Sequence, residues 1–192
     1  MGLNQCPGCG APVSMSDRVC SHCGNEVVIS SFQSVSSFSA PLLNKYVRSY
    51  DRAGETDAKM SIAKGLCYMK LKLYDKASSC FLDAIDLEMD NSEAYFFYAA
   101  SLLKGKKAFL NSRTDIDTAE QYLLDAASIE NRGIYYYFLA YLRYDHHYRK
   151  GYRVTPSYVE YLSKAKSLGV SHADINNLFL MLDLQIPDAV KI

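Results

Sequence analysis

The chain lacks an excess of charge of one sign, and it lacks any long apolar run. Its 21 Lys and Arg residues are balanced by 21 Asp and Glu residues, so it does not carry the positive excess that dominates nucleic-acid binding. No apolar run approaches the ~20 residues that a membrane-spanning helix requires, and residues 1–5 are too short for the hydrophobic part of a secretory signal peptide. These absences predict a soluble, cytoplasmic protein with reduced thiols and no membrane partner.

The chain also lacks the short motifs of common enzymes. It contains no Gly-rich phosphate-binding loop, no Gly-x-Ser-x-Gly and no His-Glu-x-x-His. We expect its carboxylates on solvent faces or near helix ends rather than as an inward pair. The adjacent His146 and His147 should face different sides of a helix and be exposed at a loop end. The sequence therefore predicts a protein that is not an enzyme and has no small-molecule substrate.

Cysteine, in contrast, occurs in a repeated pattern near the N-terminus. Two Cys-x-x-Cys-Gly units lie on either side of a ten-residue loop and supply Cys6, Cys9, Cys20 and Cys23. Each unit brings two sulfurs to one side of a tight turn, and the glycine can take the positive φ that lets backbone N–H groups point at sulfur. We predict one structural Zn²⁺ held by these four thiolates, with no open position for catalysis. A Cys₄ iron–sulfur centre uses the same spacing and is the alternative.

The composition changes to serine between residues 30 and 41, which predicts a linker. Phe32, Val35 and Phe38 recur in it at every third position, and a pure spacer has no need of them. Either this segment continues the strand that leaves the cysteine motif, or its apolar side chains dock onto the domain that follows.

The pattern beyond Pro41 is helical. One helix is expected over residues 42–53, closed by Gly54. Its inward face at 3.6-residue spacing is formed by Leu43, Tyr46, Val47 and Tyr50. The next stretch has small and aromatic residues at matched positions, namely Gly65 and Tyr68, then Ala77, Phe81 and Ala84. This arrangement resembles the tetratricopeptide repeat, a helix–turn–helix unit with a period of 34 residues.

Later segments repeat the arrangement. Gly65 recurs as Ala99 and Tyr68 as Leu102, each after 34 residues. The second and third units continue with Ala119, Leu123 and Ala126, then Tyr137, Ala140, Tyr141 and Tyr144, then Leu162 and Ala165. These matches require insertions within residues 104–117 and around residues 149–156. Ser61 and Lys64 depart from the repeat, which usually has Trp and Leu there, and a plain helical bundle is the alternative.

The resemblance implies a mainly α fold. We expect a right-handed tetratricopeptide-like solenoid of about three helix pairs, with a leading helix and a closing helix over residues 171–184 that begins at the N-cap Ser171. The cysteine motif resembles the short bacterial zinc ribbon, a small β structure, over residues 4–29. The predicted domains are the ribbon (1–29), the Ser-rich linker (30–41) and the repeat domain (42–192).

In such repeats the first helix of each pair lines a concave surface. The residues expected there are Ile62, Leu66 and Met69, then Phe96, Ala100 and Leu103, then Phe138 and Leu142. If exposed, this apolar groove suits an amphipathic helix or a hydrophobic peptide of a protein partner, or the chain's own segment 30–41. The alternative is that these side chains pack in the core.

The loops inside the three units are basic, whereas those between units are acidic. In the second and third units the basic residues are Lys104, Lys106, Lys107, Arg113, Arg149, Lys150 and Arg153, and the first unit has Lys70, Lys72 and Lys76. Equivalent loops of a solenoid lie along one edge, so we expect a basic rim that contacts an acidic protein or phosphate. Alternatively, these cations only complement helix dipoles, at ~0.3–1 kcal/mol each.

Both modules belong to classes used mainly for binding. The sequence therefore predicts an adaptor or scaffold in which the ribbon contacts one protein partner and the helical repeats another. The alternative function is a nucleic-acid-associated factor that uses the ribbon and the basic rim.

Overall fold

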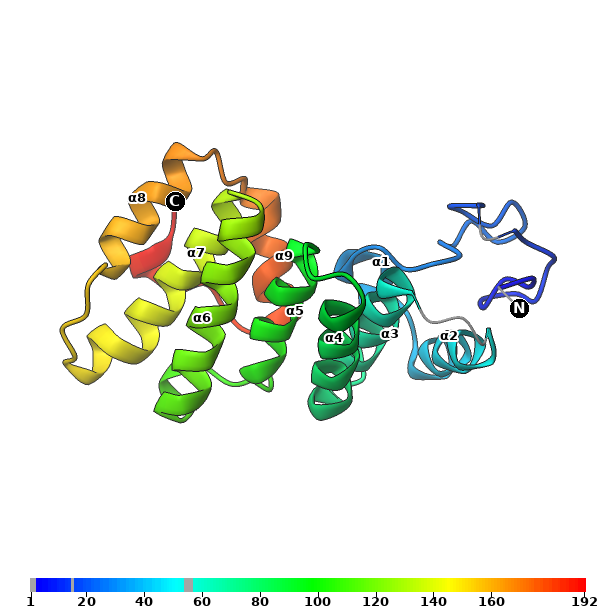
Figure 1. Ribbon diagram of the computed structural model, residues 1–192, viewed down its shortest axis with the longest axis horizontal. Helices are drawn as coiled ribbons and strands as arrows, with labels where there is room; N and C mark the ends of the chain where they lie inside the picture. The colour runs from blue at the N-terminus through cyan, green and yellow to red at the C-terminus, as the bar shows by residue number, and fades with distance from the viewer. Residues whose placement is uncertain (1–2, 15, 54–56) are drawn as a thin grey trace. The chain divides into compact units, whose positions relative to one another are not determined.

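The computed structural model describes residues 3–14, 16–53 and 57–192. The described chain is mainly helical (Figure 1) and divides into two compact units, Met1–Met89 and Asp90–Ile192. The predicted helix end at Gly54 lies outside the described residues.

The first unit begins with the cysteine-bearing segment, residues 3–14 and 16–29, which we call the head. Its described part has two isolated antiparallel bridges, Gln5 with Pro12 and Val19 with Glu26, but no extended strand. Pro12 has no N–H group to donate, so the first bridge cannot grow into a ladder on that side. The predicted β ribbon is therefore reduced to two bridged turns.

The Ser-rich segment forms a short helix. Helix α1 (Phe32–Ser36) begins at Ser31, whose hydroxyl accepts a hydrogen bond from the backbone N–H of Ser34. Phe32 and Val35 are buried, and α1 packs against α3 (Ala58–Lys70). The segment thus docks onto the helices and does not continue a strand.

Helix α2 (Ala40–Arg52) confirms the predicted leading helix. It starts with Pro41 in its first turn, where the missing N–H costs nothing. Its buried side chains are the four on the predicted face, Leu43, Tyr46, Val47 and Tyr50. The half-buried ring of Phe38 lies 5.4 Å from the ring of Tyr46.

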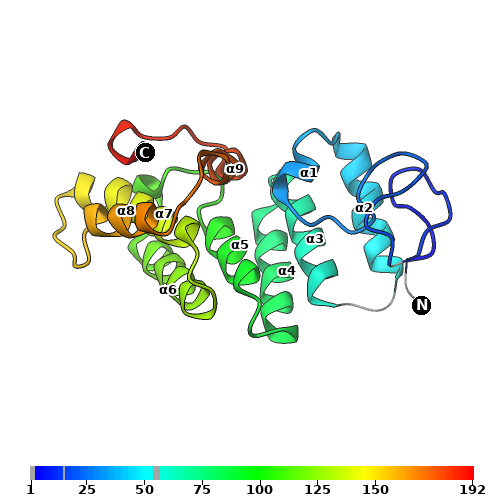
Figure 2. The same ribbon diagram turned by 90° about the horizontal axis from the view of Figure 1, so that it is seen from above.

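Helices α3 and α4 (Tyr74–Leu87) form the first predicted pair and pack along each other (Figure 2). A Cβ atom on Gly65 would lie 2.4 Å from Cε1 of Phe81. The absence of a side chain at Gly65 therefore lets the aromatic ring of α4 approach the backbone of α3. This contact is the small–aromatic pairing expected from the sequence.

The second unit contains the other two predicted pairs, α5 with α6 and α7 with α8. Its elements are α5 (Ser92–Leu102), η1 (Ala108–Leu110), α6 (Arg113–Ile129), α7 (Gly133–Leu142), the π-helical η2 (Arg143–His147), η3 (Tyr148–Lys150), α8 (Tyr158–Ser167), α9 (His172–Leu182) and η4 (Asp188–Val190). Both predicted insertions fall between paired helices, where η1 and residues 151–157 lie.

Helix α9 packs against α7 and α5 of the same unit. The ring of Phe179 lies 5.1 Å from that of Tyr141 and 6.4 Å from that of Tyr137. Ser171 caps the helix and forms a capping box with Asp174. The predicted closing helix and its N-cap are therefore confirmed.

The compact units do not follow the boundaries predicted at residues 29 and 41. The head, residues 30–41 and α2 to α4 all belong to the first unit. Val27, Ile29 and Val35 are all buried, so the core continues from the head into α1 without an exposed spacer. Within the described ranges, no helix is both long enough and apolar enough to span a membrane.

Candidate metal centre

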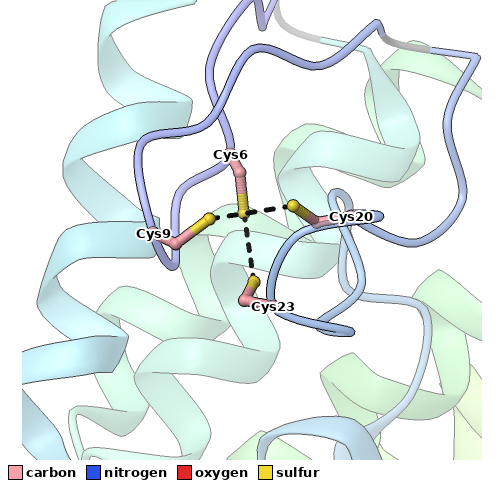
Figure 3. Close-up of side chains that lie close together, drawn as sticks. All are labelled: Cys6, Cys9, Cys20 and Cys23. Atoms are coloured by element: carbon pink, nitrogen blue, oxygen red, sulfur yellow. Dashed lines mark hydrogen bonds between the residues drawn. The ribbon is translucent and has the colours of Figure 1, made fainter.

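The head brings the four predicted ligands together. Their sulfur atoms all lie within 4.8 Å of one another, and Figure 3 shows them converging, two from each turn. The sulfurs of Cys6 and Cys23 are 3.7 Å apart, as are those of Cys9 and Cys20. A tetrahedral ion with metal–sulfur bonds of about 2.3 Å requires sulfur–sulfur distances of about 3.8 Å. The cluster therefore has the dimensions of a Cys₄ metal site.

The two turns have the same backbone hydrogen bonds. The N–H of Cys6 donates to the carbonyl of Ala11 and the N–H of Gly10 to the carbonyl of Cys6, both at 2.8 Å. Fourteen residues later, Cys20 donates to Asn25 at 2.8 Å and Gly24 to Cys20 at 2.9 Å. Gly10 and Gly24 have φ of +80° and +74°, which a side chain would disfavour.

The first cysteines of the two turns have thiol pKa values shifted in opposite directions. Backbone N–H groups of Cys23 and His22 lower the pKa of the Cys20 thiol to about 6, and the His22 N–H lies 3.4 Å from that sulfur. Burial raises the pKa of the Cys6 thiol to about 12. A metal cation supplies the positive charge that a buried thiolate needs. The donor set therefore fits a thiolate-binding ion, with all four tetrahedral positions filled by protein.

Two tyrosines of α2 hold the backbone that leaves the second turn. The hydroxyl of Tyr46 donates to the carbonyl of Glu26 at 2.8 Å. The N–H of Ile29 donates to the hydroxyl of Tyr50 at 3.1 Å. Burial raises the pKa of both phenols, so both stay neutral. The helical pattern predicted that these side chains face inward, but it gave no sign of their hydrogen bonds to the head.

The residues predicted to line a groove are core residues. All of them, Ile62, Leu66, Met69, Phe96, Ala100, Leu103, Phe138 and Leu142, are at most 9% exposed. Helix α1 packs against α3, and α9 packs against α5 and α7, so the chain's own helices cover helices that were predicted to line a groove. The structure thus shows core packing, the alternative that the sequence left open.

Some residues of the predicted basic rim in the second unit contact side chains of the same unit. The guanidinium of Arg149 lies 4.7 Å from the ring centre of Phe109 and forms an ion pair with Asp145. That of Arg113 lies 5.4 Å from the ring centre of Tyr152. Lys150 also lies over Phe109. The remaining predicted residues, Lys104, Lys106, Lys107 and Arg153, are exposed.

A buried polar cluster in the second unit was missed. His146 and His147 are each 1% exposed, so the prediction that they are exposed is wrong. The chain continues from α7 into η2 instead of ending in a loop, which carries both rings inside. Glu120 of α6, 5% exposed, lies 3.0 Å from His147 Nε2 and 2.7 Å from Arg143 Nη2. The expectation that the carboxylates lie on solvent faces or near helix ends is therefore wrong for Glu120, which is buried in the middle of α6.

Burial shifts the ionisation of this cluster. It raises the pKa of Glu120 to about 7 and lowers that of His147 to about 4, because it disfavours the charged form of each group. One sequence signal could have revealed the carboxylate. Glu120 lies four residues after Ile116 and three before Leu123, both buried, so it occupies a core position of the helical period.

Comparison of the chain with protein-family models, with curated proteins and with solved structures finds no match.

Proposed function

We propose that this protein is a non-enzymatic adaptor in which one structural Zn²⁺ folds the head and tetratricopeptide-like hairpins present a surface to a protein partner. The sulfur spacing in the head supports the metal. Zn²⁺ is favoured because four thiolates in a tetrahedron form its usual structural site. Reduced thiols suit the cytoplasm.

The helical pairing supports the repeat assignment. Helices that follow each other in the chain pack together in three pairs, namely α3 with α4, α5 with α6, and α7 with α8. Gly65 faces Phe81, as the small and aromatic positions of the repeat require. Since each pair is one supersecondary unit, three of them are enough for a short repeat array.

The observation that carries the function is an exposed aromatic and basic surface in the second unit, which we call the tyrosine edge. It comprises the exposed Tyr148, Tyr152, Arg113 and Arg149 together with the half-buried Tyr144, Tyr158 and Lys150. Tyr148 is 60% exposed and its ring lies 5.1 Å from that of Tyr158. Tyr152 is 46% exposed and lies under the guanidinium of Arg113.

Tyrosine and arginine are the residues most enriched in binding hot spots. At the tyrosine edge, ring-to-ring and cation-to-ring contacts already fix these side chains, so less conformational entropy is lost on binding. Positive charge is added by the exposed Lys106 and Lys107, between α5 and α6, and by the exposed Arg153, between α7 and α8. We therefore propose an acidic protein segment with apolar side chains as the partner, bound at the tyrosine edge and not in a groove.

Site-specific photo-crosslinking tests this function. A photoreactive amino acid is placed at Tyr148 of the full chain, and a matched variant carries it at Ser128, an exposed position of α6. We expect protein adducts at position 148 in lysate of the source organism, absent at 128 and reduced by Lys106→Glu with Lys107→Glu. No adduct at 148, or equal adducts at both positions, would contradict the proposal.

One observation favours a second function. Exposed tyrosines beside cations are also able to stack on nucleic-acid bases. The balanced total charge argues against it. Nucleic-acid adducts at position 148 that vanish steeply with rising salt would select this alternative, because phosphate contacts are lost through counterion competition.

A further inference from the structure

The second unit concentrates unpaired buried nitrogens in one place. Among the described residues, the buried side-chain nitrogen and oxygen atoms without a hydrogen-bond partner are Arg143 Nε, His146 Nδ1 and His147 Nδ1. All three belong to the π-helical segment η2, a conformation that occurs frequently at functional sites. A buried polar atom that nothing pairs with destabilises a fold, so such atoms call for an explanation. An imidazole that keeps its hydrogen on the unpaired Nδ1 of His147 presents Nε2, which faces Glu120, as a lone-pair donor to an ion.

Ligand atoms of suitable type lie next to this segment. Asp117, Glu120 and His147 each offer one ligand atom, and the three atoms lie within 4.8 Å of one another. The closest pair, His147 Nε2 and Glu120 Oε1, is 3.0 Å apart. Metal bonds of about 2.0–2.2 Å place neighbouring ligands about 3.3–3.6 Å apart. Small movements reach that spacing, and Asp117 is exposed.

Two guanidinium groups beside the cluster each contact one oxygen of a carboxylate, so the other oxygen of each carboxylate is available to an ion. Arg143 Nη2 contacts Glu120 Oε2 at 2.7 Å, and Arg113 Nε contacts Asp117 Oδ2 at 3.3 Å. The other two oxygens, Glu120 Oε1 and Asp117 Oδ1, are not used by these guanidinium groups. The two positive charges orient the carboxylates, but they also oppose a cation. We therefore expect weaker binding here than at the four thiolates.

A second imidazole completes the surroundings. The ring of His146 lies 4.9 Å from the ring of His147, and both lie 6.3 Å from the ring of Tyr152. The rings of His146 and Tyr152 therefore lie beside His147, whereas Asp117 is exposed to solvent.

We propose that Asp117, Glu120 and His147 form a second metal site, for a divalent ion of the zinc class. One imidazole and two carboxylates are donors that Zn²⁺ and Co²⁺ accept. The ion displaces the proton shared between His147 Nε2 and Glu120 Oε1, this proton is released to solvent, His147 stays neutral with its remaining hydrogen on Nδ1, and water takes the fourth position. The site differs from the head in containing no sulfur.

Cobalt titration of the full chain tests this site. The purified protein is stripped with a chelator under reducing conditions, reloaded with Co²⁺ and analysed for metal content and absorption. We expect two equivalents of Co²⁺. One gives intense sulfur-to-cobalt charge-transfer absorption, and the other lacks that absorption and is removed first by a mild chelator. Saturation at one equivalent with the sulfur bands would overturn the proposal.

Single substitutions test which residues bind the second equivalent of Co²⁺. Asp117→Asn changes an exposed side chain, so the fold is kept, and it should weaken the second equivalent by about tenfold or more. His147→Gln should remove it, with the sulfur bands unchanged. The matched control is Asp125→Asn on the same helix, whose carboxylate accepts a hydrogen bond from Gln121, and it should change nothing. A second equivalent that persists unchanged in Asp117→Asn would contradict the assignment.

Discussion

The head and the helical hairpins are stabilised by different means. In the described head, few apolar side chains are buried besides two of the cysteines, among them Leu3, Val27 and Ile29. The second unit instead buries whole aromatic side chains, including Tyr135, Tyr137 and Phe138. A segment as short as the head cannot fold on so small a core. One chain thus combines a region that has a small core and four cysteines able to hold a metal ion with a region that has a large core of its own.

Removal of the metal ligands should separate these regions most strongly. Cys6→Ser combined with Cys23→Ser should abolish metal binding at the head and unfold it, since structural Zn²⁺ contributes about 10–16 kcal/mol in zinc-finger peptides. Far-ultraviolet circular dichroism should keep its helical signal. Ser21→Ala, an exposed change between two ligands, is the control and should retain the metal. Unchanged metal binding at the head in the double variant would contradict the proposal that the four thiolates hold the ion.

A core substitution should have the opposite effect. Phe138→Ala in α7 removes a fully buried ring and should lower the free energy of unfolding by about 3–5 kcal/mol. Urea denaturation followed by helical signal measures it, and the metal content of the head should stay the same. Tyr148→Ala, an exposed aromatic change, should cost less than about 1 kcal/mol. Equal losses in the two variants would contradict the core assignment.

A smaller effect is expected at the close approach of α3 and α4. Gly65→Ala places a methyl group against Phe81, and such overpacking costs about 1–3 kcal/mol. The better helix propensity of alanine offsets up to about 1 kcal/mol, so a net loss of stability should remain in urea denaturation. Phe81→Leu added to Gly65→Ala should recover part of that loss. Stabilisation by Gly65→Ala alone would show that the two helices do not approach so closely.

The smallest effect concerns the hydrogen bonds between α2 and the head. Tyr46→Phe deletes the hydroxyl that donates to Glu26, which costs about 0.5–1.5 kcal/mol. The head should then lose its metal to a competing chelator about fivefold more readily, since 1 kcal/mol corresponds to roughly that factor. Tyr148→Phe, with an exposed ring, serves as the control. Identical metal retention in both variants would show that α2 does not support the head.

The sequence predicted those features that depend on residues close together in the chain. The cysteine ligands follow from a local spacing, because a Cys-x-x-Cys turn brings its sulfurs together within a few residues. The three helical pairs, the leading helix and the cap at Ser171 follow from periodicity and capping. The β character of the head was overestimated, since each turn forms only one isolated bridge, and Pro12 has no N–H group with which to extend the first.

Features that depend on tertiary packing were not predictable in the same way. Phe96 and Phe138 lie on the predicted helix faces, but whether those faces are open depends on where α9 packs. The burial of His147 depends on the continuation of α7 as a π-helical segment and on a carboxylate 27 residues earlier in the chain. Neither helical periodicity nor a short sequence motif predicts such a pairing.

Hydrogen exchange, measured before and after the metal is removed, tests whether the head needs an ion to fold. We expect residues 3–14 and 16–29 to lose protection when the metal is removed, while α3 to α9 keep theirs, because the proposed thiolate-bound ion folds the head and the hairpins have a core of their own. Full protection of the head without metal, or loss of protection throughout the hairpins, would contradict it.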